Sequence, residues 1–181
     1  LKGDIMKDVL VLFASNSDES VYRGILRILD KEKVSYDFKI ASAHKTPEDV
    51  DDILRQDYKV IISGAGLAAA LPGVVAAKSM RPVIGVPCKG NYEGLDALLS
   101  IVQMPPGIPV LSTGALKSDV AAQGAVKILK KSEKIVLVGD KNNRAYRKAE
   151  DILTKFEINH SHSDQIIDGA VNIVFTKFDE K

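Results

Sequence analysis

The stretch Val9-Leu10-Val11-Leu12-Phe13 decides the fold class, because it is apolar at every position. A strand with one face in water alternates polar and apolar residues, so an unbroken apolar run indicates a strand that is covered on both faces. Two further runs have a closely similar character, Lys59-Val60-Ile61-Ile62 and Pro82-Val83-Ile84-Gly85-Val86. Together they predict a parallel β-sheet with helices packed on each side.

Helical patterns alternate with these strands along the chain. The spacing of Val21, Ile25, Ile28 and Leu29 predicts a helix after the first strand, and Thr46-Pro47-Glu48-Asp49 has the capping residue, proline and acidic first turn of a helix start. Further strands are expected at 36–40 and 108–111, and further helices at 72–79, 94–102 and 118–131. Five consecutive strand–helix units predict a doubly wound α/β domain.

The chain is expected to have three parts. Residues 1–7 are an N-terminal extension, with Met6 as a candidate native start, and residues 8–132 form the α/β domain. Residues 133–181 differ: they contain two strand-like runs, 135–139 and 171–175, around a helix-like stretch, 143–156. This pattern indicates one more βαβ unit, which extends the sheet or packs on a neighbouring subunit. We find no internal repeat and no low-complexity linker.

Composition excludes several classes of function. The 181 residues contain 25 Lys and Arg against 24 Asp and Glu, so no basic field indicates a nucleic-acid partner. A single cysteine, Cys88, excludes an internal disulfide framework and fits a reducing cytoplasm. No signal-peptide pattern occurs at the start, and no apolar run reaches the roughly 18 residues of a membrane span. We therefore expect a soluble cytoplasmic protein.

Polar residues follow the first two predicted strands, where a parallel sheet binds its ligands. Ser15-Asn16-Ser17-Asp18 can hold an anion with hydroxyls and free N–H groups, or can simply cap a helix. Ser42-Ala43-His44-Lys45 combines a proton-transfer group, a hydroxyl and a cation, although His44 alone is equally consistent with a capping or surface residue. After the third strand, Gly64-Ala65-Gly66 allows a ligand close to the backbone, or a tightly packed helix.

Taken together, these loops resemble the 5-(carboxyamino)imidazole ribonucleotide mutase and aminoimidazole ribonucleotide carboxylase family of purine biosynthesis. The resemblance covers about residues 8–130. It is carried by Ser15-Asn16-Ser17-Asp18, Ser42-Ala43-His44-Lys45-Thr46-Pro47, Gly64-Ala65-Gly66, Leu71-Pro72-Gly73, Pro82-Val83-Ile84-Gly85-Val86-Pro87 and Gly94-Leu95-Asp96-Ala97-Leu98-Leu99-Ser100-Ile101-Val102-Gln103-Met104-Pro105. The last stretch and the Ser-Ala-His motif are the most specific.

The resemblance implies a three-layer αβα, flavodoxin-like fold assembled as a homo-octamer, with no metal and no organic cofactor. It implies an isomerase or lyase that binds a ribonucleotide and CO2 and moves a carboxylate to or from carbon 4 of the aminoimidazole ring. His44 would be the general acid and base, Ser15, Ser42 and Lys45 would hold the 5′-phosphate, and Asp18 would bind the ribose. The other expected substrate-binding residues are Ser17, Ala65, Gly66, Ala68 and Leu71.

Several positions depart from the family pattern. Ala14 replaces a usual glycine, Lys45 stands where the mutase branch commonly has arginine, and Leu67 and Ala70 replace a glycine and a histidine of that branch. The tail beyond Glu133 also differs from the family's C-terminal helix. The sequence is consistent with a mutase, a carboxylase or a decarboxylase reaction. The mutase reaction is the leading hypothesis, because Gly-Ala-Gly and Leu-Pro-Gly belong to the mutase branch of the family.

Three other functions are less consistent with the sequence. A non-catalytic mononucleotide-binding module would explain Leu67 and Ala70 but not the retained His44. A flavin binder is disfavoured because no aromatic residue lies beside the first loop to stack on a flavin. His160, His162 and Asp164 lack the further ligands of a metal site, so this segment is expected to be a polar surface loop.

Overall fold

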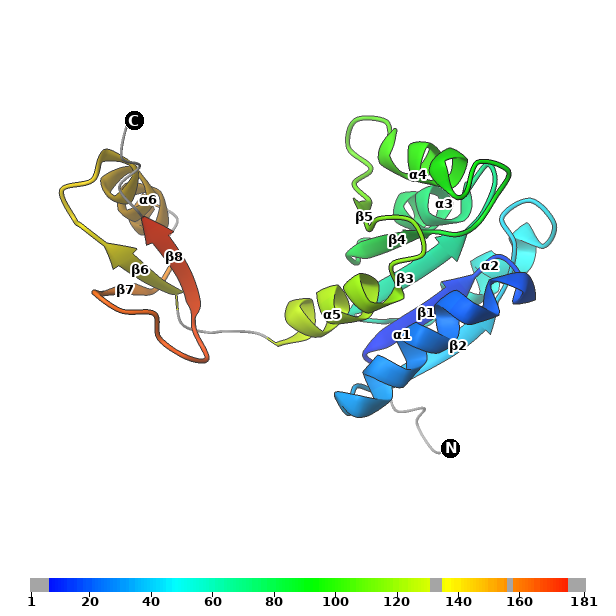
Figure 1. The fold of residues 1–181 in the computed structure, drawn as a ribbon, viewed down its shortest axis with the longest axis horizontal. Coiled ribbons are helices and arrows are strands. Elements are labelled where there is room, and N and C mark those ends of the chain that lie inside the picture. The colour runs from blue at the N-terminus through cyan, green and yellow to red at the C-terminus, as the bar shows by residue number, and fades with distance from the viewer. Residues whose placement is uncertain (1–6, 131–134, 156–157, 176–181) are drawn as a thin grey trace. The chain divides into compact units, whose positions relative to one another are not determined.

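The computed structural model describes residues 7–130, 135–155 and 158–175, which fall into two compact units, Leu1–Lys130 and Lys131–Lys181 (Figure 1). The division lies close to the boundary predicted at residue 132. Residues 1–6 of the predicted N-terminal extension, Lys131 and Phe156 lie outside the described residues.

The first unit is built on a five-stranded parallel sheet with the order β2-β1-β3-β4-β5. Its strands are β1 (Val9–Phe13), β2 (Tyr36–Ile40), β3 (Val60–Ala65), β4 (Val83–Pro87) and β5 (Leu111–Ser112). Every residue of β1, β3 and β4 is buried, as the continuous apolar runs predict, whereas β2 and β5 form the partly exposed edges. The fifth strand is shorter than predicted and begins at Leu111.

Helices cover both faces of this sheet, which gives the predicted three-layer αβα arrangement (Figure 1). The helices are α1 (Glu19–Lys31), α2 (Pro47–Ile53), α3 (Leu71–Lys78), α4 (Leu95–Val102) and α5 (Ser118–Leu129), together with a short 3₁₀ turn, η1 (Asn16–Asp18). Side chains of α1 and α5 pack on one face of β1, where Val9, Val11 and Phe13 point. Side chains of α2, α3 and α4 pack on the other face, against Leu10 and Leu12.

The strand order places a topological switch point at β1. The chain runs from β1 to β2 on one side and then returns to β3 on the other side, with Val9 aligned to both Tyr36 and Val60. Loops that leave the carboxyl ends of β1 and β3 diverge at such a point, and the crevice between them is where open α/β sheets bind ligands.

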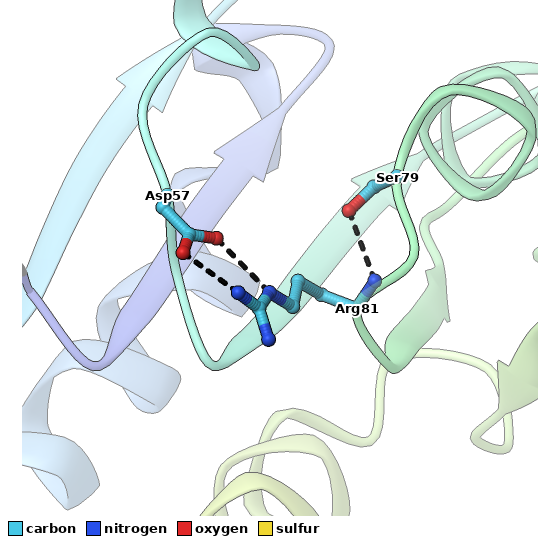
Figure 2. A network of polar contacts seen from close by, with 3 residues as sticks. All are labelled: Asp57, Ser79 and Arg81. Carbon is cyan, nitrogen blue, oxygen red and sulfur yellow. Dashed lines mark hydrogen bonds and ion pairs between the residues drawn. The ribbon is translucent and has the colours of Figure 1, made fainter.

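An ion pair links the loop before β3 to the loop before β4. Arg81 binds Asp57 through two parallel hydrogen bonds, 2.9 Å from Nε to Oδ1 and 2.6 Å from Nη2 to Oδ2, and its backbone N–H donates to Ser79 (Figure 2). The Arg81 guanidinium lowers the pKa of the Asp57 carboxyl. Because both residues lie just before their strands, the pair joins the two loops at the amino ends of β3 and β4, on the solvent-exposed surface.

The second unit forms a sheet of its own, so the prediction that the tail extends the first sheet is wrong. Its elements are β6 (Ile135–Gly139), α6 (Arg144–Lys155), β7 (His160–Ser163) and β8 (Val171–Phe175), and the parallel strands have the order β7-β6-β8. Leu137, Tyr146 and Leu153 form its core, and the Tyr146 and Phe175 rings lie 5.2 Å apart between centroids. Packing of this unit on the same domain or on a neighbouring subunit stays a prediction.

Strand β7 corrects the expectation of a surface loop at His160–Ser163. The segment has no apolar residue, so local sequence gives no strand signal. It is a strand because it pairs along its length with β6, from Ile135–His160 to Val138–Ser163.

Candidate active site

The predicted site residues converge on one pocket of about 420 Å³ at the carboxyl ends of β1, β2 and β3. All ten line it: His44, Ser15, Ser17, Asp18, Ser42, Lys45, Ala65, Gly66, Ala68 and Leu71. The remaining lining residues are Ala14, Ala43, Leu67, Ala70 and Lys89. The strand order brings the three loops together, as expected for ligand sites in parallel sheets.

The loop after β1 is held in a tight turn by its own hydroxyls. Ser15 Oγ accepts a hydrogen bond from the Ser17 backbone N–H at 3.1 Å, and Ser17 Oγ donates to Ser15 Oγ at 2.8 Å. Ser15 is thus the N-cap of η1, which is the simpler of its two predicted roles. The Ser15 oxygen accepts both of these bonds, so capping does not use its own O–H, which can donate to an anion in the pocket.

Asp18 is the acidic group of this loop, and it is half-buried. Burial raises the pKa of its carboxyl, and a polar interaction with the Cys88 thiol opposes part of that shift. Cys88 is fully buried at the end of β4, and burial raises the pKa of its thiol. The cysteine therefore stays a neutral thiol and acts as a small core residue, as lone strand-end cysteines usually do.

The loop after β2 is fixed by two hydroxyls. Ser42 Oγ accepts from the backbone N–H groups of His44, at 3.4 Å, and Lys45, at 3.3 Å. Thr46 precedes α2 as predicted, but its hydroxyl does not cap that helix and instead accepts from the Ser42 N–H at 3.0 Å. Side-chain hydroxyls of the loop therefore satisfy three of its own backbone N–H groups.

The side chains of His44 and Lys45 are exposed at this pocket. Within residues 7–130, 135–155 and 158–175, neither side chain has a hydrogen-bond or ion-pair partner. Both functional groups are therefore available to a ligand.

The loop after β3 forms the apolar wall of the pocket, and two of its positions have special backbone requirements. A Cβ atom at Gly66 would lie 2.7 Å from the Lys89 carbonyl oxygen, so only glycine fits without movement. Leu67 has a left-handed backbone with φ of +56° and is 54% exposed. A left-handed conformation costs a non-glycine residue roughly 1–2 kcal/mol, which explains why glycine suits this position better.

Lys89 is the pocket residue that sequence reasoning missed. It follows Cys88 at the end of β4, and its Nζ lies 3.3 Å from Glu93 Oε2 in a solvent-exposed pair. The signal was present, because the residues after each buried strand are the candidates for ligand contact. With Lys45, it gives the pocket a second cation.

No metal site is found in the part of the chain that the structure describes, where no three His, Cys, Asp or Glu side chains cluster suitably. His160 and His162 lie in β7, and His160 Nδ1 lies 2.9 Å from the Ile158 carbonyl oxygen. Among the described residues, no helix has both the length and the apolar character to cross a membrane.

Comparison with known proteins identifies the family. Residues 8–150 match the family described as AIR carboxylase. The N5-carboxyaminoimidazole ribonucleotide mutase of Pyrococcus abyssi is 47% identical over 129 residues, which are 68% of this chain and 74% of that protein. The mutase of Methanocaldococcus jannaschii is 45% identical over 122 residues, 67% of this chain and 78% of that protein.

Two further matches come from a fungal enzyme and a solved structure. The phosphoribosylaminoimidazole carboxylase of Schizosaccharomyces pombe is 45% identical over 124 residues, 66% of this chain but 22% of that longer protein. The crystal structure of Treponema denticola PurE has a TM-score of 0.61 at 24% identity and covers 82% of this chain and 90% of its own, which supports the fold. The chain belongs to the AIR carboxylase family.

Proposed function

We propose that the chain is a purine-biosynthesis enzyme that converts N5-carboxyaminoimidazole ribonucleotide into the 4-carboxy isomer. The observation that carries this proposal is the convergence of Ser15, Ser42, Lys45 and His44 on one pocket. That pocket lies in the part of the chain that matches relatives named for this reaction at 43–47% identity.

The phosphate of the ribonucleotide would bind between the first two loops. Ser15 and Ser42 offer hydroxyl donors, whereas the Ser17 hydroxyl donates to Ser15 Oγ, and Lys45 offers a positive charge. Charge-assisted hydrogen bonds are the strong ones, so Lys45 would contribute most. Asp18 would accept hydrogen bonds from the ribose hydroxyls, because its half-buried carboxyl keeps acceptor oxygens at the pocket.

His44 would carry the proton. In the mutase reaction the N5–carboxylate bond breaks and releases CO2, and carbon 4 of the ring then forms a bond to the same CO2. N5 gains a proton when its carboxylate leaves, and carbon 4 loses its proton after it has bound CO2, so a single group can donate the first proton and recover one in the second step. The exposed His44 imidazole at the pocket suits that role.

The apolar wall would retain CO2 between the two steps. Ala65, Gly66 and Ala68 leave room beside the substrate, and a small dry space keeps a neutral gas molecule close to carbon 4. Lys89 would offer a partner to the carboxylate. Ala70 offers no such contact, because alanine lacks the hydrogen-bond donor of the histidine that the mutase branch has at this position.

A carboxylase that uses free CO2, or a decarboxylase, is the main alternative on the same scaffold. Lys45, Leu67 and Ala70 favour it, because they depart from the mutase pattern. A mononucleotide-binding module without catalysis is the second alternative.

The deciding experiment incubates the protein separately with aminoimidazole ribonucleotide plus bicarbonate, with the N5-carboxy isomer, and with the 4-carboxy compound. Ultraviolet absorbance reports which compounds interconvert. Labelled CO2 in the medium distinguishes a mutase from a carboxylase that uses free CO2. A mutase transfers the carboxylate of its own substrate, so its product is not diluted by carbon from the medium. Binding without any interconversion would support the module instead.

We also propose a cytoplasmic homo-oligomer, with the octamer of the family as the expected form. Helix α4 supports self-association, because Leu95, Leu99 and Val102 lie on one helical stripe and are 53%, 46% and 50% exposed. Light scattering that shows a stable, active monomer would overturn this assignment.

A further inference from the structure

We infer that Lys89 is a specificity residue, which makes the pocket prefer carboxylated ribonucleotides, and that Glu93 competes with the ligand carboxylate for its ammonium group. The inference rests on the proposed function for the identity of the ligand. It goes beyond that function by assigning the preference to one side chain of the loop between β4 and α4, residues 88–94.

The two lysines of the pocket lie on opposite sides of it. Lys45 belongs to the loop after β2, and Lys89 belongs to the loop after β4. The order β2-β1-β3-β4 separates these strands by three spacings, which is about 14 Å at about 4.8 Å each. A ligand with an anionic group at each end fits this arrangement. A carboxylated ribonucleotide is such a ligand, because ribose and ring separate its 5′-phosphate from its carboxylate.

The wall beside Lys89 has no other polar side chain for a carboxylate. The residues that line the pocket from the end of β3 to the start of α3 are Ala65, Gly66, Leu67, Ala68, Ala70 and Leu71. None of these side chains donates a hydrogen bond, and an ionised group that leaves water needs polar partners. Among the described residues that line the pocket on this side, Lys89 is the one with a charge.

Packing on two sides holds the backbone of Lys89. Its carbonyl oxygen would lie 2.7 Å from a Cβ atom at Gly66, so the two loops touch there. The next residue, Gly90, is packed against α4, since a Cβ atom at Gly90 would overlap the Asp96 carboxylate. The fold therefore sets where the Lys89 side chain begins, and only its flexible end has to move toward a ligand.

Glu93 forms an ion pair with Lys89 that a ligand can displace. Lys89 Nζ lies 3.3 Å from Glu93 Oε2, and the two side chains are 66% and 78% exposed. Exposed pairs of this kind contribute little to stability, because water screens both charges. A carboxylate at the pocket wall is partly withdrawn from water by the ligand itself. Its attraction to the ammonium group is therefore stronger than that of Glu93.

The test measures the binding of two ligands to the full chain by calorimetry. The 4-carboxy ribonucleotide and aminoimidazole ribonucleotide differ only in the carboxylate. In Lys89→Met we expect about tenfold to a hundredfold weaker binding of the 4-carboxy compound and unchanged binding of aminoimidazole ribonucleotide. Lys89→Arg keeps the charge and should keep most of the preference. An equal loss for both ligands, or no loss for either, would overturn the inference.

Lys130→Met is the matched control. Lys130 Nζ also lies 3.3 Å from a glutamate, Glu32, and its side chain is 70% exposed, but Lys130 does not line the pocket. The variant changes the net charge by the same amount as Lys89→Met, so both affinities should stay as in the wild type. A loss equal to that of Lys89→Met would show an effect of net charge rather than of contact, and would contradict the assignment.

Glu93→Gln tests the competition for Lys89. Removal of the competing carboxylate should tighten the 4-carboxy compound by about twofold to fivefold, and this gain should vanish in the Lys89→Met background. A gain that persists without Lys89 would refute the competition. A wild type that binds neither ribonucleotide would overturn the proposed function and the inference together, whereas normal binding without selectivity at Lys89 would overturn the inference alone.

Discussion

Replacing Gly66 by alanine should damage the pocket through one atomic overlap. The added Cβ would lie 2.7 Å from the Lys89 carbonyl oxygen, whereas real Cβ atoms essentially never approach closer than 3.0 Å. The overlapping oxygen belongs to the Lys89 backbone and cannot rotate away as a side chain could. The loops after β3 and β4 must therefore separate by at least a few tenths of an ångström. Both loops line the pocket, and the movement therefore reaches the wall beside His44.

The expected losses of stability and of activity in Gly66→Ala have separate causes. Overpacking of this kind costs about 1–3 kcal/mol of unfolding free energy, which corresponds to a lowering of the melting temperature by about 2–12 °C. Displacement of a pocket wall by part of an ångström should lower kcat/KM by about tenfold to a hundredfold. Steady-state kinetics with the N5-carboxy isomer and thermal unfolding followed by circular dichroism measure the two quantities.

Gly73→Ala is the matched control. Its Cβ would lie 3.2 Å from the flexible end of Met104, and it lies within α3, where alanine is the better helix former. We expect unchanged kinetics and equal or higher stability. If Gly66→Ala keeps normal kcat/KM and a normal melting temperature, the close approach of the two loops does not shape the pocket.

Three further predictions concern the proton shuttle, the phosphate and acid stability. His44→Asn should lower kcat by about a hundredfold or more while ribonucleotide binding survives, and near-normal turnover would remove His44 from catalysis. Lys45→Ala should weaken the ribonucleotide by about tenfold to a hundredfold and leave a dephosphorylated riboside unaffected, with equal losses for the two ligands counting against a phosphate contact. The pKa of Asp8 is lowered by hydrogen bonds from Lys59 and Ser35, so its contribution to stability is present above the ordinary value of 3.8 and is lost as the pH falls through the folded value. Urea midpoints should therefore differ more between wild type and Asp8→Asn at pH 7 than at about pH 3, and a difference that grows on acidification would contradict the assigned interaction.

The sequence by itself determined the architecture of the first sheet and most of the residues that line its pocket. Continuous apolar runs at 9–13, 60–62 and 83–86 report burial on both faces, and burial on both faces requires helices on each side. The rule that ligands bind at the carboxyl ends of parallel strands then selects the loops with Ser15 and His44. Both arguments are local: they need only the residues of one strand and of the loop that follows it.

The tertiary structure decided the features that depend on distant partners. His160–Ser163 is a strand only through its pairing with β6, and the tail forms a separate sheet only because β6 pairs with β7 and β8. Lys89 lines the pocket because its backbone packs on Gly66. The loops after the neighbouring strands β3 and β4 meet there. Such relations arise when separate segments pair and pack, and no single stretch of sequence contains them.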